Sequence, residues 1–390
     1  MRWQHELPLT VWPQLAAVAN DAASRAPDNP AIWTGLAQAA FNLGREEETV
    51  APLQAAVQRM PDAVPLRVAL ARTLTALDRF EEALDHVQAV LDRDPDNRDA
   101  RAIGFTLLAK TDQWGKAVRE VDRVCELDPF ALQLLDVAWR AWPGQAGLER
   151  LLARSEAILA ERPDHTNAAY FRAFALAKLG RGADACRVMS VERFVEVGDL
   201  PAPAGHAGGD AFRAALREEI VHNPTLVLNP RGKSTRDGRR TRRLRRAEAP
   251  AVEALVAQIK DAVGAYTQRL SVQPGDFAQT LPQTARLDIW ASVLGPEGRQ
   301  KSHRHISGWL SGVYYVCAPR PAGENAYRGP LHLGALDPKR DRIDPPWGVR
   351  DIEPVPGRLV LFPSYVPHAT EPTGAQGDRI SVAFDVIAVR

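Results

Sequence analysis

The stretch His303-Arg-His-Ile-Ser-Gly-Trp-Leu-Ser-Gly-Val-Tyr-Tyr-Val316 places two histidines, one residue apart, in front of a run of β-branched and aromatic residues. Such a run predicts a β-strand, here from Trp309 to Val316. Two further strands are expected, one from Arg358 to Phe362, which His368 ends, and one from Arg379 to Val386. Two histidines before one strand and a third after the next can together hold one metal ion in a jelly-roll barrel.

The order of these motifs resembles the iron(II) and 2-oxoglutarate dependent oxygenases. Ser311-Gly-Val-Tyr-Tyr315, Phe362-Pro-Ser364 and Arg379-Ile-Ser-Val-Ala-Phe384 are similar to the members of that superfamily that carry tetratricopeptide repeats in front. The resemblance covers the chain from about residue 225 to the end, and it implies a double-stranded β-helix, or jelly-roll, barrel.

The resemblance also implies roles for particular residues. A non-haem iron(II) oxygenase holds its metal on one face and leaves the other positions open for 2-oxoglutarate and oxygen. The metal ligands implied here are His303, His305 and His368. Arg379 and Ser381 share a strand face and would meet the far carboxylate of 2-oxoglutarate, with Tyr315 adding its hydroxyl. A guanidinium can bind that carboxylate with two parallel hydrogen bonds, which a lysine cannot reproduce.

Position 305 departs from the commoner pattern, in which an aspartate stands one residue after the first histidine. Two explanations are open. Either three imidazoles form the site, or His305 is a neighbour and the third ligand is a water molecule or a more distant carboxylate. Three neutral imidazoles would leave iron with more net positive charge, and copper and zinc would compete more strongly. His332, on an expected strand after Gly329-Pro330, is a further histidine whose place relative to the site is left open.

Length and composition set the limits of the remaining interpretation. The chain has 390 residues, 45% hydrophobic and 25% charged, which is typical of soluble globular proteins with two or three domains. Its 49 basic and 48 acidic residues give a net charge of +1 and no general reason to expect nucleic acid or an anionic membrane. The three cysteines fit neither a zinc motif nor a disulfide framework. With no signal-peptide core and no long apolar run, we expect a cytoplasmic protein.

A repeat occupies the first half of the chain. Prolines recur every 34 residues, and four of the five are followed by aspartate; they are Pro27, Pro61, Pro95, Pro129 and Pro163. Thirty-four residues is the tetratricopeptide period, in which each unit is a helix, a turn and a helix. Ala83, Ala117 and Ala185 fall where the two helices of a unit touch and only a small side chain fits. The unit at 130–163 is degenerate, with Trp142-Pro-Gly144 at its turn.

These patterns predict a multidomain α + β protein, an all-α tetratricopeptide solenoid followed by a jelly-roll barrel. The repeat domain is expected over 1–195, with repeats from about residue 28; a linker and connecting helix over 196–225; and the oxygenase-like barrel over 226–390. Apolar residues at helical spacing over 250–270 predict a helix that covers one face of the barrel.

The partners expected from the sequence follow from these two domains. A solenoid presents a concave surface that commonly holds a peptide, although it could instead only stabilise or dimerise the barrel. The basic stretch 231–246 could bind phosphates of a nucleic acid, form a solvated loop, or attract an acidic peptide to the barrel rim. The family resemblance favours a role within the domain and makes nucleic acid the weakest of the three. The oligomeric state is left open.

The predicted function is hydroxylation of a peptide or protein side chain, with Fe(II), 2-oxoglutarate and O2 as cofactors and cosubstrates. Two alternatives belong to other classes. The barrel could be a metal-binding pseudoenzyme in which the solenoid works as an adaptor. It could also be a cupin-like enzyme with a three-histidine site that does not use 2-oxoglutarate. A nucleic-acid demethylase guided by residues 231–246 is a third.

Overall fold

The computed structural model describes residues 1–3, 17, 21–43, 45–130, 134–230, 233–241, 244–245, 249–271, 275–320, 323, 326–336, 341 and 343–389. The chain divides into two compact units. One is helical and comprises Leu7–Gly147; the other comprises Met1–Glu6 with Leu148–Arg390 and contains the sheet.

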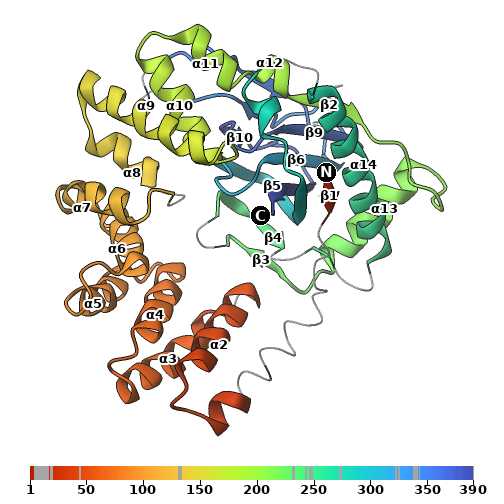
Figure 1. The fold of residues 1–390 in the computed structure, drawn as a ribbon. Coiled ribbons are helices and arrows are strands. Elements are labelled where there is room, and N and C mark those ends of the chain that lie inside the picture. The colour runs from red at the N-terminus through yellow and green to blue at the C-terminus, as the bar shows by residue number, and fades with distance from the viewer. Residues whose placement is uncertain are drawn as a thin grey trace. The chain divides into compact units, whose positions relative to one another are not determined.

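The helical unit consists of antiparallel helix pairs that follow one another along a curved row (Figure 1). Its helices are α2 (Pro30–Leu43), α3 (Glu47–Arg59), α4 (Val64–Ala76), α5 (Phe80–Leu91), α6 (Arg98–Lys110), α7 (Trp114–Leu127) and α8 (Leu134–Ala141). Each helix packs on the next, and the first helices of successive pairs also contact one another. Ala83 and Ala117 are fully buried, as the repeat pattern predicted. This is the tetratricopeptide arrangement.

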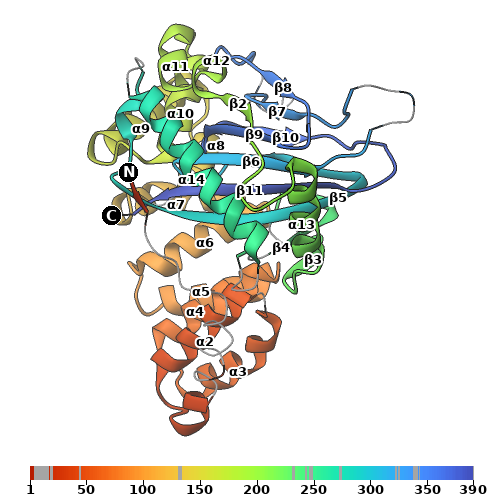
Figure 2. The same cartoon turned by 90° about the vertical axis from the view of Figure 1, so that its right-hand side faces the viewer.

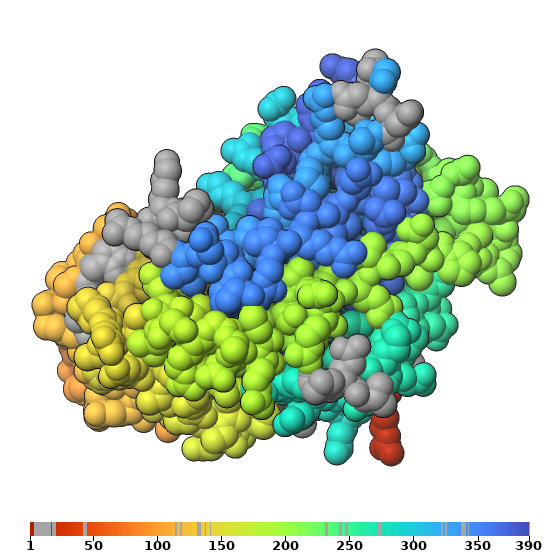
Figure 3. All heavy atoms as spheres, turned by 90° about the horizontal axis from the view of Figure 1, so that it is seen from above, coloured from red at the N-terminus to blue at the C-terminus, as the bar shows by residue number. Residues whose placement is uncertain are grey.

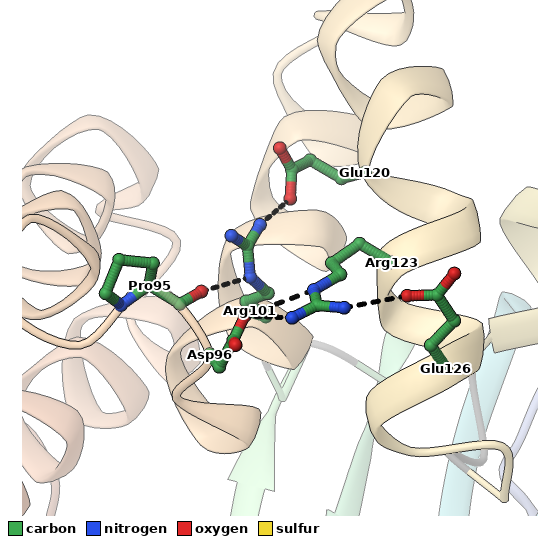
Figure 4. Close-up of polar contacts among 6 residues, drawn as sticks. All are labelled: Pro95, Asp96, Arg101, Glu120, Arg123 and Glu126. Atoms are coloured by element: carbon green, nitrogen blue, oxygen red, sulfur yellow. Dashed lines mark hydrogen bonds and ion pairs between the residues drawn. The ribbon is translucent and has the colours of Figure 1, made fainter.

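The prolines of the repeat mark a recurring hydrogen bond. The carbonyls of the first three prolines accept from the side chain six residues later: Trp33 donates to Pro27 at 2.8 Å, Arg67 to Pro61 at 3.2 Å and Arg101 to Pro95 at 2.5 Å. Figure 4 shows the third instance, in which Arg101 also pairs with Glu120, and Arg123 joins Asp96 to Glu126. Because the chain cannot satisfy these turn carbonyls within the helices, long donors from the next helices do so.

The second unit is built on a curled, mostly antiparallel sheet, a half-barrel of the jelly-roll type (Figure 2). Its strands run in the order β2 (Glu196–Asp199), β9 (Arg358–Pro363), β6 (Leu310–Cys317), β11 (Arg379–Ala388), β5 (Thr284–His303), β10 (His368–Thr370), β7 (Leu331–Leu333) and β8 (Arg350–Ile352). Off this path, β1 (Arg2–Trp3) and β4 (Thr235–Thr241) also pair with β5, and β3 (Leu226–Leu228) pairs with β4. The strands predicted around residues 309–316, 358–362 and 379–386 are confirmed to within two residues.

The two faces of the central strands have different compositions. On β11 one face carries Ile380, Val382, Phe384 and Val386, all fully buried, and the other carries polar residues. The helices α13 (Gly209–Val221) and α14 (Pro250–Leu270) lie along the apolar face (Figure 2). Helix α14 has the bounds predicted from its apolar spacing. The polar face is therefore the one that is available to build a site.

Four further helices belong to the unit that contains the sheet. They are α9 (Gly144–Glu161), α10 (Thr166–Lys178), α11 (Gly182–Val188) and α12 (Val191–Phe194). Figure 3 shows them, in yellow and green, directly against the blue C-terminal segments. The last tetratricopeptide period, which starts at Pro163, thus packs with the sheet.

Two details differ from the sequence expectations. His368 was predicted to end the strand at 358–362, and this is wrong, because β9 stops at Pro363 and His368 starts the separate strand β10. The middle of the basic stretch 231–246 forms strand β4, which is not a solvated loop. Residues 231, 232, 242, 243 and 246 of that stretch lie outside the described residues. Among the described helices, none combines the length and apolar character that a membrane span requires.

Candidate metal centre

The sheet register brings the first and the last of the three histidines together. His303 is the final residue of β5, and His368, the first residue of β10, is its direct partner in the antiparallel ladder. Directly opposed residues of neighbouring strands have side chains on the same face. Strand pairing alone therefore brings together His303 and His368, which are more than sixty residues apart in the chain.

The third histidine joins them from the loop that follows β5. One ring nitrogen from each of His303, His305 and His368 lies within 4.8 Å of the other two. The ring centroids are 5.1 Å apart for His303 and His305, 4.2 Å for His303 and His368, and 4.9 Å for His305 and His368. Within the described residues this is the one group of three or more such side chains with the spacing for a metal ion.

Each imidazole is held by its Nδ1 atom. The Nδ1 of His303 lies 2.7 Å from the carbonyl of Lys301, and that of His368 lies 3.0 Å from the carbonyl of Val366. A carbonyl oxygen can only accept, so Nδ1 carries the proton in both rings and Nε2 keeps its lone pair. This is the arrangement found in metal-bound histidines, whose second nitrogen donates to a carbonyl or carboxylate. The Oγ of Ser234 lies 3.2 Å from Nε2 of His303.

His305 is oriented by a carboxylate that the sequence reasoning missed. Its Nδ1 lies 2.5 Å from Oδ1 of Asp385 on β11, and Ser311 donates to the same oxygen at 2.6 Å. Ser311 in turn lies 2.8 Å from the hydroxyl of Ser364, whose carbonyl accepts from the backbone of His305. The carboxylate of Asp385 thus holds the ring of His305 at its Nδ1 atom. One signal could have found it, since Asp385 is an acidic residue between the apolar residues Phe384 and Val386.

Burial shifts the acid–base behaviour of the cluster. Burial, together with the neighbouring His305, lowers the pKa of His303 to about 3. Burial also lowers the pKa of His368 well below its ordinary value, with His303 and His305 adding to the effect. Both rings are therefore neutral near pH 7, which is the form that binds a metal. Three imidazole nitrogen donors, each ring oriented through its Nδ1, fit a divalent transition metal.

Arg379 lies on the same face, at the start of β11. Its side chain is 1% exposed and donates to the carbonyl of Gly329 and, at 3.0 Å, to Oγ1 of Thr370. Gly329 has a φ of 71° and a Cβ there would lie 2.6 Å from the guanidinium, so only glycine allows this approach. Among the described residues, no carboxylate contacts Arg379. A buried cation with only neutral acceptors fits the carboxylate of an organic acid.

Ser381 and Tyr315, both predicted from the sequence to meet the cosubstrate, lie opposite one another in the sheet. They are direct partners in the ladder between β11 and β6, and Ser381 follows Arg379 on the same face of β11. Burial raises the pKa of Tyr315 to about 12, although the nearby guanidinium of Arg379 acts against this rise. The phenol thus keeps its proton and can donate a hydrogen bond. Arg379, Ser381 and Tyr315 form one polar corner.

Aromatic side chains enclose the imidazoles. Trp290 of β5 lies 5.4 Å from the ring of His305, and Phe362 of β9 lies 4.9 Å from the ring of His368. The guanidinium of Arg240, from the basic stretch, lies over Trp290 at 4.4 Å, and its charge acts to lower the pKa of His303. Arg240 therefore belongs to the surroundings of the cluster, as does Ser234 of the same stretch.

Two other features lie apart from the three histidines. His332 is on β7, where it contacts Asp351 at 2.6 Å and Glu371 at 3.3 Å, and it does not belong to the cluster. A cavity of about 330 Å³ lies beside the loop 304–308 and is lined by α9, α10, Phe277, Trp309 and Tyr365. None of the three clustered histidines lines it.

A helical repeat region and a half-barrel with clustered histidines define the class of the protein, and family comparisons refine it. Residues 288–385 match the family described as "Putative 2OG-Fe(II) oxygenase", and residues 47–110 match the family described as "Tetratricopeptide repeat". The chain therefore has a tetratricopeptide-repeat region at 47–110, followed by a region at 288–385 that matches this 2-oxoglutarate and iron(II) oxygenase family.

Solved structures with some likeness include both kinds of domain. A prolyl-4-hydroxylase from Pseudomonas putida shares 18% identity over 52% of this chain and 99% of its own, with a TM-score of 0.36. YrrB, a TPR protein with an unusual peptide-binding site, shares 17% identity over 44% and 89%, and MamA from Desulfovibrio magneticus RS-1 shares 16% over 41% and 90%; both have a TM-score of 0.36. No curated protein matches the sequence.

Proposed function

We propose that the protein is an Fe(II)- and 2-oxoglutarate-dependent dioxygenase that hydroxylates a peptide or protein substrate held by its repeats. The observation that supports this most is the meeting of His303, His305 and His368 with the buried Arg379 on one polar face of the sheet. A metal cluster alone is compatible with many activities. A buried guanidinium beside it is what a dicarboxylic cosubstrate requires.

The residues have distinct tasks in this proposal. The Nε2 atoms of the three histidines bind iron, and the acceptors at their Nδ1 atoms fix the direction of each ring. Arg379 binds the far carboxylate of 2-oxoglutarate, with the hydroxyls of Ser381 and Tyr315 beside it. Trp290 and Phe362 limit access of water. When bound, iron supplies the activation of O2, for which no side chain has the chemistry.

The proposed overall reaction is a balanced oxygenation. One substrate C–H bond, one 2-oxoglutarate and one O2 give one C–OH, one succinate and one CO2. The repeat region supports a peptide or protein as substrate, because stacked repeats offer an extended concave surface of the kind that holds a chain. We expect no need for nucleic acid, since the described centre of the basic stretch is a strand of the sheet.

The test is succinate formation from 2-oxoglutarate by the full chain, loaded with iron without oxygen and then exposed to air in the presence of cell lysate. We expect succinate from the wild type and none from His368→Ala or Arg379→Ala. If iron binds tightly and the wild type forms no succinate, the adaptor interpretation replaces the proposal.

One alternative is favoured by a specific observation. The third donor is an imidazole, as in cupin-like three-histidine enzymes that do not use 2-oxoglutarate. In that case Arg379→Ala would retain activity toward the substrate, whereas the dioxygenase requires Arg379 for every turnover.

Whether His305 is a ligand is tested by replacing it in two ways. We expect His305→Ala to weaken metal binding by at least about tenfold, and His305→Asp to retain it, because an aspartate restores the commoner ligand set. Unchanged metal affinity in His305→Ala would show that His305 is only a neighbour.

A further inference from the structure

The loop 304–308, which carries one of the clustered histidines, is held by the first turns of α10. Thr166, the first residue of that helix, donates from Oγ1 to the carbonyl of Gly308 at 2.5 Å. At the other end of the loop, Arg304 reaches the same helix with its side chain. The loop lies outside the strand ladders, so these contacts replace the hydrogen bonds that a strand would supply.

The socket for Arg304 is made of three side chains of α10. The guanidinium lies over the ring of Tyr170 at 3.7 Å and near that of Phe171 at 5.1 Å. It also donates to Oδ1 of Asn167. Asn167, Tyr170 and Phe171 are 0%, 4% and 1% exposed, so the socket is fixed by the packing around it. When a guanidinium stacks on an aromatic ring and also donates a hydrogen bond, both the orientation and the position of the group are fixed.

Arg304 lies between two of the clustered histidines in the sequence. The socket that holds its side chain therefore also affects these two histidines. His303 and His305 both face the cluster, whereas the side chain of Arg304 between them contacts α10. Fixing the side chain of Arg304 on α10 therefore restrains the short segment that carries both histidines. The backbone N–H of His305, which donates to Ser364 at 3.0 Å, fixes the same segment from the opposite side.

We propose that Arg304 is a positioning residue for the metal centre, and that the last tetratricopeptide helix pair, through α10, is a structural part of that centre. This inference rests on the proposed metal site. The inference predicts in which direction the metal affinity changes when Arg304 is replaced. Removing a positive charge close to a divalent cation should, by Coulomb's law alone, strengthen metal binding. Removing a residue that positions the ligands should weaken it.

The experiment measures the affinity of the full chain for Co(II) and Zn(II) by competition titration, together with the visible absorption of bound Co(II). We expect Arg304→Gln and Tyr170→Leu each to weaken binding by about tenfold or more, in the range seen for groups that orient metal ligands. The absorption bands of Co(II) should change as well, because they report ligand geometry. The double variant should be no weaker than either single variant, since both remove the same contact.

Two further variants make the test specific. Arg304→Lys keeps the charge and loses the planar fork, so we expect an affinity between those of the wild type and Arg304→Gln. Arg172→Gln is the matched control. It removes an arginine of the same helix that pairs with Asp276 and Glu156 and does not contact the loop, and it should leave metal binding unchanged.

Three results would overturn the proposal. They are tighter metal binding by Arg304→Gln, wild-type binding by Arg304→Lys, and losses that add fully in the double variant. A failure of the proposed site itself gives a different result, because wild type and His368→Ala would then bind Co(II) equally. Thermal unfolding of each variant shows whether it is folded at the temperature of the titration.

Discussion

Asp385 places a buried carboxylate directly behind a candidate metal ligand, at 2.5 Å from Nδ1 of His305. Its effect is to keep the proton on Nδ1 and the lone pair on Nε2, and to make the imidazole a stronger donor. Ser311 donates to the same oxygen and so limits the ways in which the carboxylate can turn.

We predict that Asp385→Asn weakens metal binding by about 10- to 100-fold while the fold is retained, because an asparagine that turns its amide nitrogen toward Nδ1 favours the wrong tautomer. Competition titration with Zn(II) measures the affinity, and circular dichroism checks the fold. Ser381→Ala is the comparison, since Ser381 is on the same strand and belongs to the polar corner with Arg379 and Tyr315. Equal metal affinity for Asp385→Asn and wild type would show that His305 does not need its carboxylate.

The residues of the site differ in how far the sequence could predict them. His303 and His368 were found from their place beside strands, and Arg379, Ser381 and Tyr315 from the family resemblance together with strand alternation. Asp385 and Arg304 were missed, because their roles depend on contacts with Ser311 and with α10, from distant parts of the chain. No period or spacing in a single sequence predicts such contacts.

At the scale of elements, the close packing of β6 on β11 depends on a glycine. A Cβ at Gly312 would lie 2.3 Å from the ring of Phe384, which is fully buried on the apolar face. The two strands could not approach with any larger residue there unless the ring moved.

We predict that Gly312→Ala lowers the free energy of unfolding by about 2 kcal/mol, the usual range for overpacking a core. The double variant Gly312→Ala with Phe384→Leu should be less destabilised than the sum of its parts. Gly198→Ala on β2 is the control, because nothing lies within 4 Å of its Cβ position. Urea unfolding measures all five proteins, including Phe384→Leu alone, and equal stability of Gly312→Ala and wild type would contradict the packing account.

The elements themselves were largely predictable. Runs of strand-forming residues predicted β6, β9 and β11, helical spacing predicted α14, and the recurring prolines predicted the repeats. The short strand β10 was not predicted, because three residues beginning with His368 carry no apolar alternation. Strand β4 was hidden by its arginines. Its register with β5 turns Arg239 and Arg240 to opposite faces, where one pairs with Asp378 and the other lies over Trp290.

At the scale of the whole molecule, the helices α9–α12 and the sheet form one compact unit. The sequence placed the repeat domain at 1–195 and the barrel at 226–390. The large side chains Phe171, Phe174 and Phe194 of the intervening helices are almost fully buried within this unit. Removing those helices would expose the surfaces on which these rings pack.

We predict that a chain of residues 144–390 folds and binds Zn(II) with nearly the affinity of the full chain, and that residues 196–390 do not bind it tightly. The reason is that only the longer chain keeps the socket of Arg304 and the rings packed around it. Zinc titration of both chains tests this. Tight binding by the shorter chain would show that the sheet holds the centre without α10.

The central claim is that the three histidines and Arg379 serve a 2-oxoglutarate-dependent oxygenation. Its most direct test is to supply the iron-loaded full chain with 2-oxoglutarate and ¹⁸O2 and to analyse the succinate by mass spectrometry. We predict succinate that carries one ¹⁸O atom from O2, formed by the wild type and lost in Arg379→Ala. Succinate without ¹⁸O, or equal labelling with and without Arg379, would contradict the proposed function.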